Sequence, residues 1–336
     1  MTIKDISRKT GYSVGTVSRV LNDQPNVSEK ARKVILEAAR ESGFQLNTIA
    51  KQLKQHHTNT ILVVVKGRSN ELFGSLLEEI SAQAAHLPYP LYVDYVDEED
   101  NEVLRAVQLC REKKPLGVLF LGGNTESFRQ HFQGVEQPCV LITGDAGTLE
   151  FPNLSSVAID DRRAGYLAVY HLCSLGHRDI AVIGGDPAVS ETARLRLDGC
   201  MAAFRELGLR FDPQKDYITG RFSYADGSRA AQYLMDQRRS FTAIFAMADV
   251  LAIGAIRALQ DRGLRVPEDV SVMGFDGLTI GNYFSPRLST VRQSVTALAQ
   301  TSIALLKAGL EGQPACHKTI EPELEQKEST KKYRAN

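Results

Sequence analysis

The sequence predicts a small all-α head followed by a two-lobed α/β body with parallel sheets. Two observations lead to this prediction. In residues 1–41, apolar side chains recur at helical spacing on both sides of a turn at Gly11. From residue 60 onward, short strands that are apolar throughout alternate with helices, which is typical of parallel sheets covered on both faces. A chain of 336 residues is long enough for two or three such domains.

The head has the pattern of a helix-turn-helix. Residues 3–10 and 14–21 are predicted helices, with Thr2 and Ser13 as their N-caps. The second helix is expected to turn an apolar face inward, formed by Val14, Val17, Val20 and Leu21. A third helix at residues 28–41 completes the head, and its predicted apolar face consists of Ala31, Val34, Ile35, Ala38 and Ala39.

The front of the second helix is the candidate DNA-reading surface. Its small first residues would let the helix end approach base edges in a major groove, and Arg19 is the expected base reader. Residues 1–57 contain ten Lys and Arg against five Asp and Glu, a net charge of +5 in a chain whose net charge is zero. Such local positive charge is what phosphate contacts require. The candidate contacts are Val14, Gly15, Thr16, Ser18, Arg19 and Asn22.

The letters VGTVSRVLN at residues 14–22, a third helix that opens with Val27 and Ser28, and the segment 47–53 resemble the lactose-repressor (LacI/GalR) family of bacterial regulators. The resemblance extends from residue 2 to about residue 330. It implies that residues 47–53 form a hinge helix, which pairs with its twin in a second subunit and enters the minor groove of an operator. A helix of at most two turns is too short to be stable alone in water. The implied contacts are Asn47, Ala50 and Leu53; Leu53 is either a wedge between base steps or an ordinary packing leucine.

The chain order sets the expected domain boundaries. Residues 1–46 form the head, 47–59 the hinge and linker, and 60–330 the body, and the tail 331–336 is expected to be disordered. The first lobe is predicted at about 60–156 with a return near 291–320. The second lobe is predicted at about 157–290 with a C-terminal segment, and a strand at 157–159 opens it. The resemblance implies that these lobes form a periplasmic-binding-protein-like sensor.

Two such lobes would hold a small molecule between them, because ligands of open α/β sheets lie beyond the carboxyl ends of the strands. The fork of Arg196 could hold adjacent hydroxyls or a carboxylate, and Asp276 could accept hydrogen bonds from the same ligand. By resemblance, both occupy ligand-contacting positions of the family. The alternative is that they form an ion pair with each other across the two lobes.

Other candidates for this cleft follow the strands in the same way. Phe73 and Phe222 could form apolar walls, or they could belong to the core. Weaker candidates are Leu72, Ser190, Thr192 and Asp249. Ala248 stands where the family commonly has an Asn before the Asp, which counts against a sugar ligand.

The resemblance implies a sequence-specific, homodimeric transcriptional regulator, expected to be a repressor, whose operator affinity is shifted by a sugar or sugar derivative. A nucleobase-type corepressor is the alternative within the class, and a solute-binding protein or a sugar enzyme is the alternative outside it. The N-terminus lacks a signal sequence and the chain lacks an apolar run of membrane length, so a cytoplasmic protein with no membrane partner is expected. Five scattered cysteines and the lack of catalytic or phosphate-binding motifs favour neither metal, cofactor nor enzyme.

Overall fold

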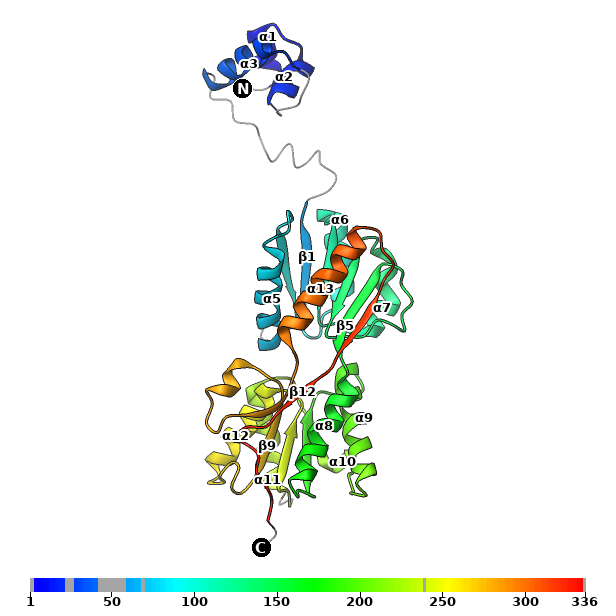
Figure 1. The fold of residues 1–336 in the computed structure, drawn as a ribbon, viewed down its shortest axis with the longest axis vertical. Coiled ribbons are helices and arrows are strands. Elements are labelled where there is room, and N and C mark those ends of the chain that lie inside the picture. Colours follow the sequence, from blue (N-terminus) through cyan, green and yellow to red (C-terminus); the bar gives the residue numbers. More distant parts are fainter. Residues whose placement is uncertain (1–2, 22–26, 42–58, 68–69, 238–239, 335–336) are drawn as a thin grey trace. The chain divides into compact units, whose positions relative to one another are not determined.

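The chain divides into two compact units, Met1–Thr58 and Asn59–Asn336. They are seen in a computed structural model, which describes residues 3–21, 27–41, 59–67, 70–237 and 240–334 (Figure 1). Each unit has a hydrophobic core of its own. The second unit consists of two lobes, each built around one sheet.

The first unit is a three-helix bundle. Helices α1 (Ile3–Thr10) and α2 (Val14–Leu21) are joined by a turn in which Gly11 has a φ of +74°, and α3 is Glu29–Glu41. Ser13 caps α2, since its Oγ accepts from the backbone N–H of Thr16 at 3.2 Å. The buried core consists of Ile6, Val17, Val20, Ala31, Ile35, Ala38 and Ala39. This confirms the predicted helix-turn-helix; the proposed Thr2 cap lies outside the described residues.

Two side chains of this bundle differ from the predicted packing. Val14 is 45% exposed and Val34 is 38% exposed, so neither belongs to the core. Val14 is the first residue of α2, where the helix has no preceding turn against which to pack. Fewer side chains of α2 therefore face inward than its apolar pattern predicts. Val14 lies on the outer front, where it was also predicted as a candidate DNA contact.

The first lobe of the second unit is a six-stranded sheet in the order β11-β5-β4-β3-β1-β2, with every pair parallel. Its strands are β1 (Ile61–Lys66), β2 (Leu91–Val96), β3 (Gly117–Leu121), β4 (Cys139–Ile142), β5 (Leu154–Ile159) and β11 (His317–Ile320). One face is covered by α5 (Glu71–Ala84) and α13 (Val295–Leu310), and the other by α6 (Glu102–Lys113), α7 (Thr125–His131) and the short turn η1 (Phe132–Gly134).

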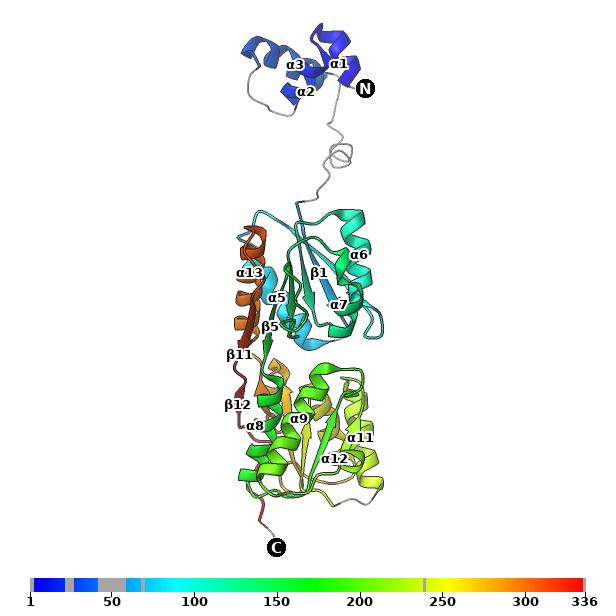
Figure 2. The same ribbon diagram turned by 90° about the vertical axis from the view of Figure 1, so that its right-hand side faces the viewer.

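The second lobe repeats this plan with the order β12-β10-β9-β8-β6-β7, in which only β12 is antiparallel to its neighbour. Its strands are β6 (Ile180–Gly184), β7 (Tyr217–Thr219), β8 (Ala243–Ala246), β9 (Ser271–Asp276), β10 (Ser289–Arg292) and β12 (Glu323–Glu325). Helices α8 (Asp161–Ser174) and α9 (Glu191–Glu206) cover one face (Figure 2), and α11 (Tyr224–Asp236) and α12 (Asp249–Asp261) the other. The short helices α10 (Pro213–Asp216) and η2 (Thr279–Asn282) lie in connecting segments.

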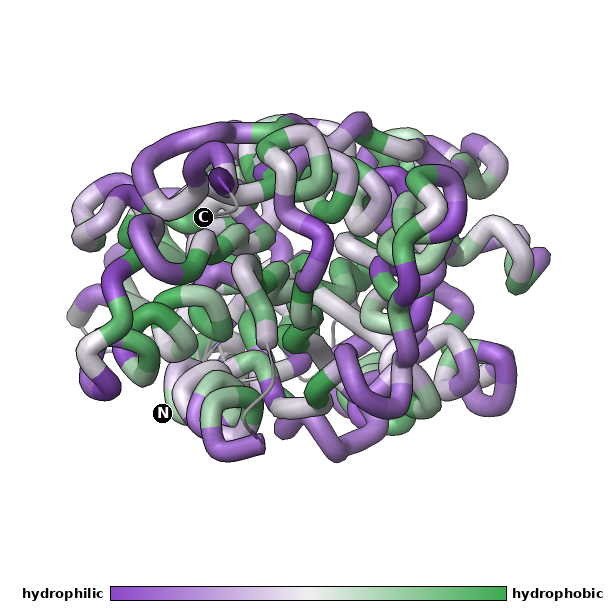
Figure 3. Tube along the Cα trace, turned by 90° about the horizontal axis from the view of Figure 1, so that it is seen from below, coloured by the Kyte–Doolittle hydropathy of each residue, from purple (hydrophilic) through white to green (hydrophobic). Residues whose placement is uncertain are grey.

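Hydropathy follows this layering. β3, β6 and β8 are buried along their whole length, as is β1 except for its last residue, Lys66, and hydrophilic residues predominate on the outer turns of the trace (Figure 3). Among the described residues, none of the helices has the length and hydropathy needed to span a bilayer.

The lobe boundary near residue 157 was wrong. The strand that was expected to open the second lobe is part of β5, which pairs with β4 and β11 in the first sheet. A strand that is apolar on both faces fits either sheet equally well, so its pattern does not identify its neighbours. β10 likewise belongs to the second sheet, whereas α13 and β11 return to the first lobe. Three crossings therefore join the lobes, after β5, after β10 and after β11.

Glycines bring the helix pairs of the second lobe into backbone contact. A Cβ on Gly165 of α8 would lie 2.1 Å from the carbonyl oxygen of Arg196 on α9, and one on Gly199 would lie 2.0 Å from that of Arg162. On the other face, Gly227 of α11 and Gly254 of α12 stand in the same reciprocal relation. Each of these positions therefore excludes any side chain.

The expected disorder of the C-terminal tail was also wrong for its described part, which is bound to the second lobe. The backbone N–H of Tyr333 donates to the carbonyl of Leu175 at 2.8 Å, and its ring lies 5.5 Å from that of His177. His177 Nε2 is 3.1 Å from the carbonyl oxygen of Lys331. Backbone groups and one ring hold the tail in place, so it does not need an apolar pattern to be ordered.

Candidate functional site

The outer front of α2 presents a short stretch of small and basic residues. Val14, Gly15 and Arg19 are exposed, whereas Thr16 is half-buried with its Oγ1 2.9 Å from Ser13 Oγ. Arg19 is therefore available to a partner from the side opposite the core residues Val17 and Val20. Ser18 lies in α2 with its side chain not described, and Asn22, Asn47, Ala50 and Leu53 fall outside the described residues.

A cleft of about 680 Å³ lies between the two lobes of the second unit. Its lining residues follow the carboxyl ends of strands from both sheets, as the sequence predicted for parallel sheets. The predicted residues that line it are Leu72, Phe73, Ser190, Thr192, Arg196, Phe222 and Asp276. Asp249 is fully buried and is not part of the lining.

Arg196 is held by the body of the second lobe. Its Nε donates to Asp161 Oδ1 at 2.7 Å and its Nη1 to the Met247 carbonyl at 2.8 Å, and the guanidinium lies 3.7 Å from the centre of the Phe275 ring. Arg196 and Asp161 are 7% and 5% exposed. Burial raises the pKa of Asp161, and the arginine opposes that shift. One edge of the guanidinium thus has fixed partners beside the cleft.

The alternative in which Arg196 pairs with Asp276 across the lobes was wrong. Both residues belong to the second lobe, and the carboxylate that pairs with Arg196 is Asp161. Asp161 begins α8, and the close glycine contacts between α8 and α9 bring it to Arg196. No periodicity along the sequence shows this crossing, because it depends on contacts between two helices.

Asp276 ends β9 with a φ of 109° and is 8% exposed. Its Oδ1 accepts from Gln293 Nε2 at 2.8 Å, and its backbone carbonyl accepts from the Gln293 N–H at 3.0 Å. Burial raises the pKa of Asp276 to about 7, although Arg196 acts in the opposite direction. Gln293 was not among the predicted site residues, because β10, the strand that it directly follows, was not predicted either.

Asp249 is buried behind the cleft lining, where it holds β10 and the loop after β9 by hydrogen bonds. Its Oδ1 accepts from Thr290 Oγ1 at 2.7 Å and its Oδ2 from the backbone N–H of Leu278 at 2.6 Å. Burial, together with the nearby charge of Asp276, raises the pKa of Asp249 to about 8. It therefore positions the loop after β9 and does not face the cleft.

The apolar walls serve both the cleft and the core. Phe73 is 9% exposed, and a Cβ on Gly122 would lie 2.7 Å from its ring. A Cβ on Gly185 would lie 3.1 Å from the ring of Phe222, which is half-buried. The glycines that follow β3 and β6 thus leave room for the two aromatic rings, and the two readings of these phenylalanines hold together.

Ser190 and Thr192 lie where α9 enters the cleft. Ser190 Oγ accepts from the backbone N–H of Ala193 at 3.3 Å and so caps α9, and it lies 3.1 Å from Thr192 Oγ1. The two hydroxyls form a small polar edge beside the apolar walls.

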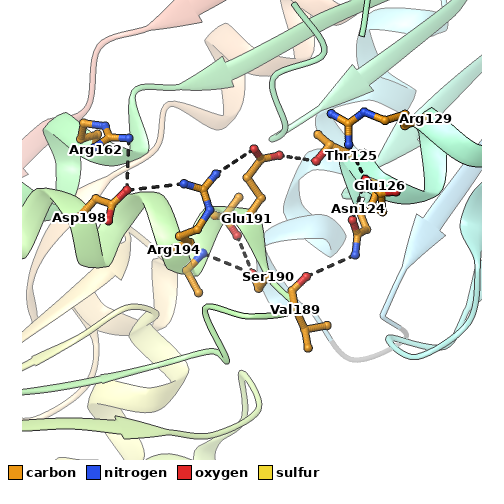
Figure 4. Close-up of polar contacts among 12 residues, drawn as sticks. Asn124, Thr125, Glu126, Arg129, Arg162, Val189, Ser190, Glu191, Arg194 and Asp198 are labelled. Carbon is orange, nitrogen blue, oxygen red and sulfur yellow. Dashed lines mark hydrogen bonds and ion pairs between the residues drawn. The ribbon is translucent and has the colours of Figure 1, made fainter. Parts of the chain in front are cut away.

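The lobes touch along the rim of the cleft (Figure 4). Thr125 Oγ1 of the first lobe donates to Glu191 Oε2 of the second at 2.6 Å, and Asn124 Nδ2 donates to the Val189 carbonyl at 3.3 Å. Glu191 also pairs with Arg194 at 3.2 Å on its own helix. The polar rim is therefore anchored on α9, the helix that carries Arg196.

Charge along the described lining is mainly negative. Seven carboxylates and four basic side chains belong to it, and each of these four basic side chains already has a carboxylate partner within the chain. Lys66, for example, lies 2.5 Å from Glu102. The part of the chain that the structure describes contains no cluster of three metal-binding side chains.

Comparison with known proteins matches both units of the chain. Residues 2–47 match the family of bacterial regulatory proteins, lacI family, and residues 169–330 match a periplasmic binding protein-like domain. The HTH-type transcriptional regulator MalR of Clostridium butyricum is 34% identical over 313 residues, covering 91% of this chain and 92% of the relative.

Two solved structures share the fold. A transcriptional regulator CelR–cellobiose complex superposes with a TM-score of 0.72 at 25% identity, covering 98% of this chain and 99% of that one. A lac repressor dimer bound to operator and the anti-inducer ONPF superposes with a TM-score of 0.78 at 24% identity, covering 98% and 99%. With the helix-turn-helix unit and the two-lobed cleft in place, the chain belongs to the lacI family of bacterial transcriptional regulators.

Proposed function

We propose that this regulator reads an operator through the front of α2 as a homodimer in the cytoplasm, and that a small molecule in the cleft controls its operator affinity. The observation that carries the proposal is that one chain combines an α2 front with exposed Arg19 and an interlobe cleft of about 680 Å³. A cleft of this volume suits a sugar or a nucleobase derivative.

The proposed recognition places the first residues of α2 in a major groove. Val14, Gly15, Thr16 and Ser18 would approach base edges, with Arg19 and Asn22 as polar readers. Asn47, Ala50 and Leu53 would contact the minor groove at the operator centre. The free-energy cost of inserting a leucine between base steps would be offset by the additional contacts that the bent DNA makes. Two heads in a dimer then require half-sites about one helical turn apart.

The proposed control is linkage between two sites. A ligand changes operator affinity only to the extent that it binds the two arrangements of the lobes with different affinity. Contacts across the rim, such as Thr125 with Glu191, would differ between these arrangements, since the two residues belong to different lobes. We propose repression in the absence of an inducer as the simplest form.

The proposed ligand is an uncharged sugar or sugar derivative. Its ring would lie between Phe73 and Phe222, with Arg196, Asp276, Ser190 and Thr192 offering hydrogen bonds. The negative lining supports a neutral ligand over an anionic one. A nucleobase remains the second candidate, because two aromatic walls suit a flat base and Ala248 offers no amide to sugar hydroxyls.

The test begins with selection of operator sequences from a random duplex library by the purified full-length protein. Fluorescence anisotropy then measures the affinity for the selected operator with and without sugars, sugar phosphates and nucleobases. We expect one ligand to change operator affinity by at least fivefold, within the usual range of allosteric coupling. Equal binding to every duplex, with no ligand effect, would refute the proposal. Ligand binding without any DNA discrimination would instead favour a solute-binding protein.

A further inference from the structure

The last described residues of the chain, 330–334, form a strap on the second lobe, and it rests on the turn between α8 and β6. The backbone N–H of Tyr333 donates to the Leu175 carbonyl at 2.8 Å. A Cβ on Gly176, whose φ is +95°, would lie 3.1 Å from the Tyr333 carbonyl oxygen. The glycine therefore allows the strap backbone to lie directly against the turn.

Two buried histidines contact the strap. His177 is 2% exposed, and both of its ring nitrogens have partners: Nε2 lies 3.1 Å from the Lys331 carbonyl oxygen and Nδ1 lies 2.9 Å from Thr242 Oγ1. Because a carbonyl oxygen only accepts, Nε2 carries the hydrogen, and in the neutral ring Nδ1 accepts from the threonine hydroxyl. The second ring, His171, is 6% exposed, and its Nε2 lies 3.4 Å from Thr330 Oγ1.

The surroundings of both rings favour the uncharged form. Burial lowers the pKa of His177 and of His171; the charge of Lys331 lowers that of His177 further, although the Lys331 carbonyl opposes this shift. The segment before β8 contributes the Thr242 hydroxyl, and β10 contributes the Ser289 hydroxyl, which bonds to the strap. The partners of the two rings in the described part of the chain are thus hydroxyls and a carbonyl, and none is a carboxylate.

The charges nearby leave little to balance a proton on either ring. Three of the four side chains at 331–334 are basic. In the turn below, Arg178 and Asp179 are both exposed and have opposite charges. Asp269, before β9, already pairs with Arg265 at 2.9 Å. A protonated histidine would therefore be a buried positive charge beside a basic segment.

We propose that the strap is an acid-released switch, in which protonation of His177 and His171 detaches residues 331–334 while the second lobe stays folded. This goes beyond the proposed function and does not depend on it. Two effects act together: a buried imidazolium loses its hydration without gaining a carboxylate partner, and it repels the basic side chains of the strap. Release returns the rings to water, where histidine has its ordinary pKa of about 6.5.

The direction of the pH dependence follows from linkage. Since docking of the strap lowers the pKa of both rings, docking is complete above the ordinary value and is lost as pH falls below it. Each proton taken up on release changes the ratio of released to docked strap by about tenfold per pH unit. The slope of the transition therefore counts the histidines that take part.

The experiment uses a single fluorescent reporter. The chain has no Trp, so Tyr333→Trp in the full-length protein places the only indole on the strap. Its fluorescence anisotropy is measured from about pH 8 to about pH 5, which spans the ordinary histidine pKa. We expect high anisotropy at the alkaline end and a fall below about pH 6.5, with a slope of about tenfold to about a hundredfold per pH unit. Far-ultraviolet circular dichroism should stay unchanged over the same range.

Matched variants in the reporter background separate the histidines from other acid effects. His177→Gln keeps both hydrogen bonds, because the amide NH₂ donates and its oxygen accepts, but it takes up no proton. It should reduce the slope to at most about tenfold per pH unit, and adding His171→Gln should abolish the transition. His86→Gln is the control, because His86 is an exposed histidine of the first lobe, and its pH profile should match that of the reporter protein. Lys331→Gln keeps the backbone carbonyl and removes a positive charge, so it should move release to lower pH.

Constant anisotropy across the pH range overturns the proposal, as does release at an unchanged pH in the variant that lacks both histidines. Loss of circular dichroism together with the strap also overturns it, because the lobe itself would then unfold. Should His177→Gln fail to fold, Lys331→Gln decides, since its side chain is exposed, and an unshifted profile overturns the proposal. Should the indole be mobile already at the alkaline end, removal of C-terminal residues from the unaltered chain by a carboxypeptidase, normalised to a free peptide of the same sequence, takes the place of anisotropy with the same expectations.

Discussion

Arg196→Met tests how much the buried ion pair between Arg196 and Asp161 contributes to the stability of the second lobe. The substitution leaves the carboxylate of Asp161 5% exposed and without its arginine, and it removes the donor to the Met247 carbonyl. Removing one member of a buried pair costs about 3–5 kcal/mol of unfolding free energy, because the remaining charge stays desolvated. We expect a loss in this range, since both partners are buried.

The double variant with Asp161→Asn separates pairing from packing. Contacting residues have coupling energies of about 0.5–3 kcal/mol, so the double variant should be more stable than the sum of the two single losses predicts. Arg194→Met on the same helix is the control, because Arg194 is exposed and its ion pairs lie at the surface. Its expected effect is below about 1 kcal/mol.

Urea unfolding followed by far-ultraviolet circular dichroism measures these losses, since the chain has no Trp for fluorescence. If Arg196→Met is no more destabilising than Arg194→Met, or if the two single losses simply add, the buried pair does not stabilise the lobe. The result also bears on ligand studies. Loss of ligand response in Arg196→Met alone combines a lost contact with a weakened lobe, and the double variant is the proper comparison.

Three further outcomes are expected. Arg19→Ala should reduce the preference for the operator over random duplex by about 1–3 kcal/mol in anisotropy titrations while sparing ligand binding, and an unchanged base preference would exclude Arg19 as a reader. Gly199→Ala should destabilise the protein by about 1–3 kcal/mol in urea, because its Cβ would lie 2.0 Å from the Arg162 carbonyl oxygen; full stability would mean that the helices separate without cost. Burial raises the pKa of Asp249 from 3.8 to about 8, so the folded state holds an extra proton between these values. The stability contributed by that proton is complete at low pH and is lost as pH rises through about 8. Urea unfolding at several pH values should therefore show a smaller decline of stability with pH for Asp249→Asn than for the wild type. An equal decline in the two proteins would refute this role of Asp249.

The sequence was sufficient for those features that depend on local pattern. Period and capping predicted the helix-turn-helix, with Gly11 and Ser13 at its turn, and apolar runs predicted most strands of both sheets, but not β10 and β12. The rule that ligands lie at the carboxyl ends of strands was enough to find Phe73, Arg196 and Asp276 in one cleft.

Features that depend on which elements become neighbours were beyond it. β5 is buried along its whole length, so its pattern does not identify its sheet, and Asp161 meets Arg196 only because α8 crosses α9 at glycines. Asp249 carries the same kind of side chain as Asp276 and also follows a strand, yet its burial makes it a support for a loop. The tail is held mainly by backbone hydrogen bonds, which leave no trace in composition.

The glycine crossings of the second lobe have a mechanical consequence. Where main chain rests on main chain, as at Gly165 with Arg196 and at Gly227 with Leu251, there are no rotamers to rearrange, and the layers on both sides of the sheet are stiff. The second lobe is therefore expected to rotate relative to the first lobe as one rigid body. Any change of angle between the lobes must then be absorbed by the few residues that span the three crossings, and Gln293 is one of them.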